Sequence, residues 1–325
     1  MSLTSSSVSV IIATRNRPAL LVNTVRAVAQ GSLLPTELII VDSSDDPSSE
    51  NNIVKEHWPF PLQYVRTEIR SAARQRNHGA ELAIGHYLVF LDDDLSFDCT
   101  FLSELIRPFS EGADPSLLGV GATNVSCTFA DPSFLNRCLL SLFVGKCEGD
   151  WSGRLLGPAI NFAPRDIPGG LTQVDWLASV AVVYPRDVFL KCRFEESFEG
   201  YSFAEDVHLS ARIARRGRLV VSGTARLVHL DGANQDTRNW RSIGSQAIKN
   251  RRLIMTDILD RRSAADYFRF YAYELLYNTL AVALQRPLRW VHFRRSVLLL
   301  AGKLEESLMR ATRRDTLATT PTHRE

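Results

Sequence analysis

Residues 70–94 read RSAARQRNHGAELAIGHYLVFLDDD, and this stretch decides the fold class of the 325-residue chain. Ser71–Ala83 has the pattern of a helix, and Ser71 is a suitable N-cap. Tyr87–Leu91 is a continuous apolar run, which is typical of a strand buried on both faces. This strand leads directly into three adjacent carboxylates, Asp92-Asp93-Asp94.

The same alternation continues toward the N-terminus. Apolar runs predict strands at Val8–Ala13, Leu38–Val41 and Leu62–Val65, and Pro18 suits the first turn of a helix. This alternation indicates an α/β fold with a largely parallel sheet. Three of the predicted strands end in polar clusters, at residues 14–17, 42–46 and 92–94. We expect these clusters to converge on one sheet edge, where such folds bind ligands.

The remainder of the chain is less regular. Residues 124–170 are rich in glycine and proline and are predicted to be irregular, and their length suggests a functional loop or an excursion from the fold. The later predicted elements are a strand at Val180–Tyr184, a helix at Phe203–Arg216, short strands at Leu219–Val221 and Leu227–Val228, and three helices within residues 238–314.

The carboxylate triplet is the sharpest chemical feature. Three adjacent carboxylates at a strand end repel one another, and a bound divalent cation relieves that repulsion. Oxygen ligands suit Mg²⁺ or Mn²⁺, and such an ion can also bind the phosphates of a diphosphate. The alternative is a solvated acidic turn. The triplet therefore predicts a metal site beside a diphosphate.

A second acidic feature, Glu205-Asp206, opens the helix predicted over Phe203–Arg216. Carboxylates in this position either stabilise the helix dipole or act as a general base. Three arginines, Arg70, Arg74 and Arg76, precede the triplet. Their planar guanidinium groups suit phosphate recognition, although an exposed helix face is the alternative.

Together, four ordered stretches resemble the family 2 glycosyltransferases of the GT-A fold. The stretches are VSVIIATRNRP (8–18), LIIVDSSDD (38–46), QRNHGAELAIGHYLVFLDDD (75–94) and FEGYSFAEDVHLSARIARRG (198–217). The resemblance implies a GT-A catalytic domain over residues 1–232, with a Rossmann-like α/β sheet and helices on both faces. Residues 233–325 then form a basic, mainly α-helical C-terminal region.

The resemblance also implies a donor site. Thr14, Arg15 and Asn16 would line the nucleotide pocket, and Asp42 would contact the base of the nucleotide sugar. Arg76 would lie near the diphosphate or the base. A UDP-sugar is the favoured donor.

Metal ligands are implied in the same way. Asp92 and Asp94 take the places of the Asp-x-Asp motif, with Asp94 as the direct ligand of Mn²⁺ or Mg²⁺ and Asp93 near the sugar. His229, in the stretch LVHLDG, matches a late histidine that completes the metal or diphosphate site. A lone histidine after a short strand is otherwise often only packed.

Catalytic and acceptor residues follow from the resemblance too. Asp206 takes the place of the catalytic base of inverting members, with Glu205 beside it. Asp175 and Trp176 lie where the family often shapes its acceptor pocket, although Trp176 can equally belong to the core. The implied reaction moves one sugar to a hydroxyl of a saccharide or lipid-linked acceptor, as in cell-surface polysaccharide or glycolipid biosynthesis.

Other functions are weaker fits. Processive members carry a QxxRW motif, but Gln235–Trp240 has an extra residue before the tryptophan. A sugar-nucleotide nucleotidyltransferase or a dinucleotide-binding dehydrogenase needs a glycine-rich loop after the first strand, where this chain has TRNRP. A catalytically inactive sugar-nucleotide-binding module is the remaining alternative, and the retained triplet and Asp206 count against it.

Charge is unevenly distributed along the chain. Residues 1–232 hold 21 basic and 27 acidic side chains, whereas residues 233–325 hold 17 and 9. The overall charge of +2 argues against a general nucleic-acid binder. The basic tail either contacts an anionic membrane surface or packs on protein. Five cysteines without CxxC spacing, and an N-terminus without signal-peptide features, predict a cytoplasmic protein, with a peripheral position at the inner face of the membrane as one option.

Overall fold

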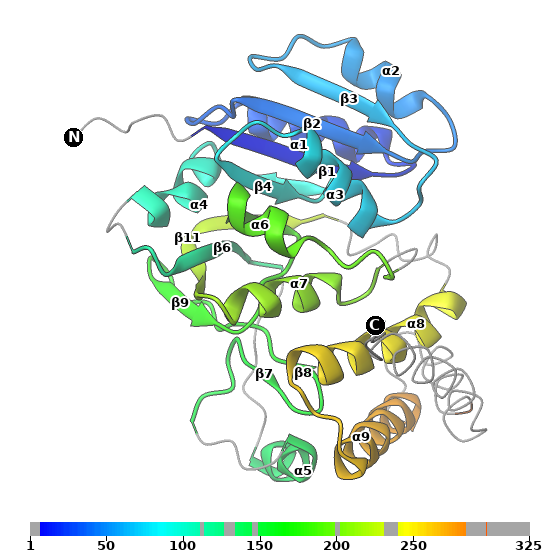
Figure 1. Ribbon diagram of the computed structural model, residues 1–325. Helices are drawn as coiled ribbons and strands as arrows, with labels where there is room; N and C mark the ends of the chain where they lie inside the picture. The colour runs from blue at the N-terminus through cyan, green and yellow to red at the C-terminus, as the bar shows by residue number, and fades with distance from the viewer. Residues whose placement is uncertain are drawn as a thin grey trace, which may run out of the picture.

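The computed structural model describes residues 7–110, 114–126, 134–144, 149–198, 202–230, 240–283 and 297. Its centre is a nine-stranded sheet in the order β3-β2-β1-β4-β10-β6-β11-β5, with β9 paired to β11 (Figure 1). The first four strands of this order run parallel, as predicted. They are β1 (Val8–Thr14), β2 (Glu37–Asp42), β3 (Leu62–Arg66) and β4 (Tyr87–Leu91).

The second half of the sheet is mixed rather than parallel. Here β10 (Ala181–Pro185) runs antiparallel to both β4 and β6 (Leu117–Asn124). β11 (Arg218–His229) is a single strand parallel to β6, where two short strands were predicted. The register of β11 against β6 shifts between Ser222 and Arg226. This shift interrupts the run of apolar residues in the sequence, although the strand itself continues. Two short strands, β5 (Leu95–Phe97) and β9 (Leu171–Val174), pair antiparallel to β11.

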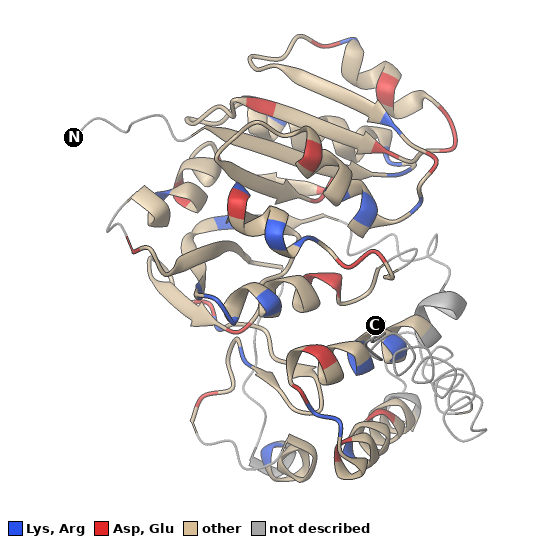
Figure 2. Cartoon of the chain, viewed as in Figure 1, with Lys and Arg blue, Asp and Glu red and all other residues tan. Residues whose placement is uncertain are grey.

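Helices cover both faces of the sheet, and β1 shows why. Val10 and Ile12 pack into one hydrophobic cluster while Ile11 packs into the other, and all three are fully buried. One face carries α1 (Pro18–Ala29), α2 (Ser48–Val54) and α4 (Phe101–Ser110). The other face carries α3 (Ala72–Leu82), α6 (Arg186–Cys192) and α7 (Glu205–Ala214). Figure 2 shows charged residues mainly on helices, loops and strand ends.

α3 lies unusually close to β1, and one glycine allows this. A Cβ atom on Gly79 would stand 2.5 Å from Cγ2 of Ile11, so a larger residue would push the helix away from the sheet. Ser71 occupies the predicted N-cap position but makes no capping hydrogen bond with its side chain. Its hydroxyl instead donates to the carbonyl of Phe198 at 3.2 Å, which ties the start of α3 to the loop before α7.

The stretch predicted to be irregular contains regular structure. α5 (Phe134–Val144) is a helix, and β7 (Leu155–Leu156) pairs with β8 (Ile160–Asn161) in a small hairpin. The prediction was wrong here because a distant partner stabilises α5: the ring of Phe143 lies 5.7 Å from that of Tyr273. Local composition does not reveal such a partner.

The described part of the C-terminal region is helical, as predicted. It comprises α8 (Trp240–Leu253), a π-helical turn η2 (Ile254–Ile258) and α9 (Ala264–Ala283). Met255 and Phe270 share a hydrophobic cluster with Val207 of α7, so these helices pack on the side of the sheet that carries α7 (Figure 1). Between α8 and α9, Arg251 and Glu274 form a buried ion pair of 2.8 Å. The third predicted helix lies outside the described residues apart from Val297.

Candidate functional site

The polar turns after β1, β2 and β4 meet at one edge of the sheet, as predicted. Asn16 donates its side-chain amide to Asp45 Oδ2 at 2.7 Å, and the backbone N–H of Asp45 donates back to Asn16 Oδ1 at 2.9 Å. Thr14 donates its hydroxyl to Asp93 Oδ2 at 2.5 Å. Asn16 has a positive φ of 56°, a conformation that asparagine tolerates better than most residues, and it turns the chain back into α1. Three loops thus form one site.

Asp93 is the buried centre of the carboxylate triplet. Its side chain contacts Thr14 through Oδ2 and Arg17 through Oδ1, the latter at 3.1 Å. Its backbone carbonyl accepts a hydrogen bond from the Thr24 hydroxyl at 2.9 Å. Burial raises the pKa of Asp93 to about 6, against the opposing charge of Arg17. Both of its oxygens therefore fasten the triplet to the β1–α1 turn, while a contact with the donor sugar stays a prediction.

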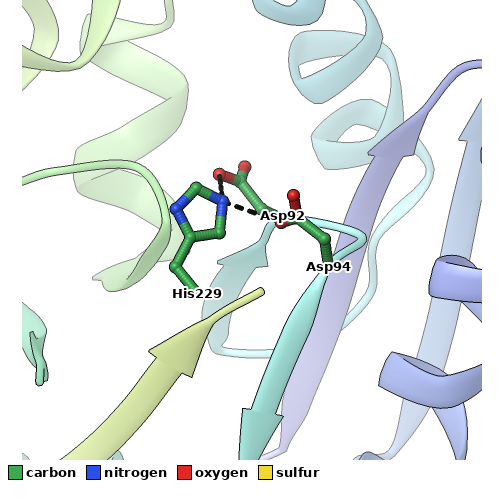
Figure 3. Close-up of side chains that lie close together, drawn as sticks. All are labelled: Asp92, Asp94 and His229. Atoms are coloured by element: carbon green, nitrogen blue, oxygen red, sulfur yellow. Dashed lines mark ion pairs between the residues drawn. The ribbon is translucent and has the colours of Figure 1, made fainter. Parts of the chain in front are cut away.

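Asp92, Asp94 and His229 form a cluster of ligand atoms at the ends of β4 and β11 (Figure 3). His229 Nε2 lies 2.8 Å from Asp94 Oδ1 and 3.9 Å from Asp92 Oδ2. One atom from each residue can be chosen so that all lie within 4.8 Å of one another. Two carboxylate oxygens and an imidazole nitrogen are donors that Mn²⁺ accepts. This cluster can therefore hold a divalent cation, and it is the set that the sequence predicted.

The charge state of Asp94 suits a metal ligand. Burial on its own would raise the pKa of Asp94, but hydrogen bonding with His229 and the charges of His229 and Arg17 lower it below its ordinary value. The side chain of His229 is 27% exposed, which distinguishes it from a merely packed histidine. A cation binds the ionised form of a carboxylate and the neutral form of an imidazole. The lowered pKa of Asp94 favours the first of these forms, and the exposure of His229 leaves its imidazole accessible.

Arg76 joins this cluster to α7. Its Nη2 lies 2.7 Å from Asp92 Oδ1, and its Nη1 pairs with Glu205 Oε1. The guanidinium carbon also lies 5.6 Å from the ring centre of Phe194, and the side chain is only 7% exposed. Burial would lower the pKa of Arg76, but Glu205 and Asp92 raise it, so the group stays charged. Arg76 is thus engaged by two carboxylates, and a contact with the donor stays a prediction.

The start of α7 presents the second pair of carboxylates. Ala204 precedes it with a positive φ of 65°, which turns the chain sharply into the helix. Burial raises the pKa of Glu205 to about 7 and also raises the pKa of Asp206. The backbone N–H groups of Val207 and Ser179 donate to the Asp206 carboxylate at 2.8 and 3.4 Å. A half-buried carboxylate with a raised pKa is suited to accept a proton.

A cavity of about 640 Å³ opens beside the β2 end of the site. Asp45 lies in its wall, where it contacts Arg15 at 3.5 Å and Arg70 at 2.5 Å. Asp42 is fully buried, and its carboxylate accepts hydrogen bonds from the Ser44 N–H at 2.7 Å and the Tyr64 hydroxyl at 2.6 Å. The residues lining the cavity are Ser43, Ser44, Asp45, Arg66, Thr67, Glu68 and Arg70. Its size is that of a small-molecule site, and its polar lining suits a nucleotide.

The two predicted acceptor residues have structural partners. Asp175 Oδ2 accepts hydrogen bonds from Arg154 Nε at 2.9 Å and from the Leu155 N–H at 3.0 Å. Trp176 is 9% exposed, and its indole N–H donates to the Phe162 carbonyl at 3.0 Å. Of the two alternatives for Trp176, burial favours a place in the core.

Arg17 is the site residue that sequence reasoning missed. It lies between the predicted nucleotide residues and Pro18, yet it contacts Asp93 and Asp94 rather than the cavity. The pairing of Arg76 with Glu205 was missed as well. The sequence shows that these residues carry charge, but their partners come from strands and helices far along the chain.

Comparison with known proteins shows sequence similarity to glycosyltransferases in the N-terminal part of the chain. Residues 9–143 match the family described as Glycosyl transferase family 2. A protein of Haemophilus influenzae described as an uncharacterized glycosyltransferase is 37% identical over 92 residues, which are 28% of this chain and 29% of that protein. This chain therefore aligns with less than a third of the relative's length.

Solved structures share the fold at low sequence identity. GalNAc-T7, in a crystal structure with UDP, GalNAc and Mn²⁺, has a TM-score of 0.58 and 15% identity over 92% of this chain and 56% of its own. The mannosyltransferase PcManGT from Pyrobaculum calidifontis, in complex with GDP-Man and Mn²⁺, has a TM-score of 0.54 and 16% identity over 97% of this chain and 81% of its own.

Both similar structures are GT-A glycosyltransferases, and the likeness confirms the predicted GT-A fold with its central sheet between two layers of helices. The segment matched by sequence contains β1, β2 and β4, and with them the Asp92–Asp94 triplet. The sequence similarity to glycosyl transferase family 2 thus covers residues 9–143 of the chain.

Proposed function

We propose that the protein transfers one sugar from a nucleotide-sugar donor to a hydroxyl group of an acceptor, with inversion at the anomeric carbon. The observation that carries this proposal is the metal-ligand cluster of Asp92, Asp94 and His229, which Arg76 connects to the α7 carboxylates. In this proposal residues 1–232 are the catalytic domain, and residues 233–325 are a basic helical region attached to it.

The donor is proposed to bind along the edge where β1, β2 and β4 end. The nucleotide would occupy the cavity beside Asp45, the wall residue that Arg15 and Asn16 contact. Thr14 and Asp42, which end the neighbouring strands β1 and β2, would complete this donor site. A UDP-sugar is favoured by the family resemblance. The GalNAc-T7 and PcManGT structures, which hold UDP and GDP-Man respectively, support a nucleoside-diphosphate donor class.

Asp92, Asp94 and His229 would hold the cation next to the diphosphate. When bound, Mn²⁺ or Mg²⁺ supplies positive charge that offsets the negative charge developing on the leaving group. The neighbours of Asp94 keep its carboxylate ionised, and Arg76 holds Oδ1 of Asp92. The protein would therefore position these two carboxylates before the cation binds.

Asp206 is the proposed general base. Its carboxylate would take the proton from the acceptor hydroxyl as that oxygen forms a bond to the anomeric carbon. The bond from the anomeric carbon to the diphosphate oxygen breaks, and its electron pair leaves with the nucleoside diphosphate. Because attack and departure occur on opposite faces, a single displacement inverts the anomeric centre. Glu205 would serve by keeping Arg76 in place beside Asp92.

A saccharide or lipid-linked acceptor, used in polysaccharide or glycolipid biosynthesis, is the acceptor class that we propose. Asp175 accepts a hydrogen bond from the Leu155 N–H, and Leu155 shares a hydrophobic cluster with Val207, the residue after Asp206. This proximity supports an acceptor that would bind between Asp175 and Asp206. Transfer of a single sugar per encounter fits the imperfect QxxRW-like stretch. Within the described residues, no helix is long and apolar enough to cross a membrane.

Peripheral membrane contact is proposed for the end of the molecule that carries α5 and α9. Phe268 of α9 is 75% exposed and Leu142 of α5 is 69% exposed, and a basic residue, Arg269, is exposed next to Phe268. Apolar side chains beside arginine suit an anionic lipid surface. Flotation of the full chain with anionic vesicles tests this. We expect Phe268→Ser with Leu142→Ser to reduce the floated fraction, and an unchanged fraction would refute this contact surface.

A thermal-shift panel tests the donor assignment. Nucleoside diphosphates are added with and without Mn²⁺, and the matching nucleotide should raise the unfolding temperature only when Mn²⁺ is present, because a ligand of the native state stabilises it. Metal-dependent release of the nucleoside diphosphate from the matching sugar nucleotide then tests turnover. Binding without turnover would favour the inactive binding module, and sugar-nucleotide formation from a nucleoside triphosphate would favour the nucleotidyltransferase.

A further inference from the structure

The two carboxylates of the metal-ligand cluster share one feature: each uses one oxygen for an arginine and turns the other toward His229. Asp92 Oδ1 lies 2.7 Å from Arg76, and Asp92 Oδ2 faces His229. Asp94 Oδ2 lies 2.9 Å from Arg17, and Asp94 Oδ1 lies 2.8 Å from His229. The oxygens that a cation would use are thereby separated from those that hold the side chains in place.

Arg17 is well placed to hold Asp94. It is the N-cap residue of α1, directly before Pro18, so its backbone is fixed by the start of a helix. A single nitrogen, Nη1, reaches both Asp93 Oδ1 at 3.1 Å and Asp94 Oδ2 at 2.9 Å. Asp93 is itself anchored by Thr14, so the guanidinium joins Asp94 to a fixed neighbour.

We propose that Arg17 is a positioning residue for the metal site: it holds Oδ2 of Asp94 so that Oδ1 faces the cation. This inference rests on the proposed function, because it requires that Asp92, Asp94 and His229 bind a metal. The role differs from that of Arg15 and Asn16, which contact Asp45 at the nucleotide cavity.

The charge of Arg17 and its hold on Asp94 have opposite effects on metal affinity. The direction in which the affinity changes when Arg17 is replaced therefore separates the two effects. The positive charge of Arg17 repels a divalent cation, and its removal would tighten metal binding if charge alone mattered. Loss of the hold on Asp94 would weaken metal binding, because partners that orient a ligand side chain are typically worth about 10- to 100-fold in metal affinity. We expect the positioning effect to dominate.

The test is a titration of the full-length protein with Mn²⁺ in the absence of nucleotide, with free Mn²⁺ measured by its electron paramagnetic resonance signal. Arg17→Gln should bind Mn²⁺ about tenfold more weakly than the wild type. The matched control is Arg26→Gln, an exposed arginine of the same helix whose partner is Glu56, and its Mn²⁺ affinity should be unchanged. Equal or tighter binding by Arg17→Gln would overturn the inference.

A second variant serves if circular dichroism shows that Arg17→Gln does not fold. Arg17→Lys keeps the charge but replaces the guanidinium with a compact ammonium on a different stem. It should bind Mn²⁺ several-fold more weakly, and an affinity equal to that of the wild type would overturn the positioning role. If the wild-type protein itself binds no Mn²⁺, the metal assignment in the proposed function fails, which is a different result from any change confined to Arg17.

Discussion

Two groups of carboxylates face the same site, and they are held in different electrical environments. Asp94 contacts His229 and Arg17, and these neighbours lower its pKa despite its burial. Asp206 at the start of α7 is held by backbone N–H groups, and burial raises its pKa. The first environment maintains a negative charge, whereas the second favours uptake of a proton. The same residue type therefore suits a cation at one end of the site and general-base catalysis at the other.

Arg76 is the connection between the two groups. It contacts Asp92 on the metal side and Glu205 on the α7 side with different nitrogens of one guanidinium. This contact fixes the spacing of the two groups across a site assembled from distant parts of the chain. Four predictions follow from the contrast between them.

The largest expected effect is on the proton-accepting side. Asp206→Asn should lower kcat for sugar transfer by about 10²- to 10⁴-fold, because the amide cannot take the acceptor proton. Calorimetric titration should show nucleotide binding unchanged, since the donor site remains intact. Asp187→Asn, at an exposed acid in the first turn of the neighbouring helix α6, is the control and should retain activity. Normal turnover by Asp206→Asn would remove this residue from the mechanism.

Breaking the link between the groups should affect stability next. Arg76→Gln leaves Asp92 and buried Glu205 without their shared cation, and loss of one partner of a buried ion pair costs about 3 kcal/mol or more. Urea unfolding measures this loss. Arg74→Gln is the matched control two residues earlier, where an exposed pair with Glu196 at 3.6 Å should contribute less than about 1 kcal/mol. Similar losses in both variants would mean that Arg76 is not a structural link.

Two histidines sharpen the distinction between site and core. His229→Ala should weaken Mn²⁺ binding with little change in the free energy of unfolding, because the side chain is partly exposed at the ligand cluster. His208 is a buried residue of α7 with 2% exposure. Burial lowers its pKa to about 4, so its side chain is neutral at pH 7. His208→Ala should lower the free energy of unfolding by about 2 kcal/mol and leave Mn²⁺ binding intact. The opposite assignment of effects would contradict the proposed ligand set.

The last prediction is a pH dependence of stability from Glu205. Its pKa is raised by burial from 4.5 to about 7, so the native state binds the proton more tightly than the unfolded chain. The stability of the wild type relative to Glu205→Gln should be greatest below about pH 4.5 and should fall as the pH rises to about 7. Urea unfolding of both proteins across this range measures the difference. A constant difference would show that Glu205 titrates normally.

Much of the fold was predictable because its signals are local. Tyr87–Leu91 is a strand with the predicted bounds, and α1 begins at Pro18 as predicted. The apolar run of β4 and the fixed φ of proline act within a few residues. α5 was missed because its stability depends on contact with α9, more than 100 residues later, and β11 was divided in two because its register shift breaks the apolar pattern.

The candidate site was predictable to a different degree. Asp92, Asp94 and His229 come together as expected, since strand ends on one sheet edge bring distant residues into contact. Trp176 was left open between a sugar-binding surface and the core, and only its burial and its hydrogen bond to Phe162 favour the core. The position of Asp45 between Arg15 and Arg70 was likewise invisible, because no sequence pattern encodes which surface charges meet.

By itself, the sequence predicted the alternation of strands and helices in the first 120 residues, the residues proposed as metal ligands and the acidic start of α7. Those features depend on residue type and on spacing along the chain. Only the tertiary structure decided how charge is shared: that Arg17 holds Asp94, that Arg76 joins Asp92 to Glu205, and that Asp94 and Asp206 have pKa values shifted in opposite directions. The physical reason is that burial and the distance between charges set these energies, and both exist only after the chain has folded.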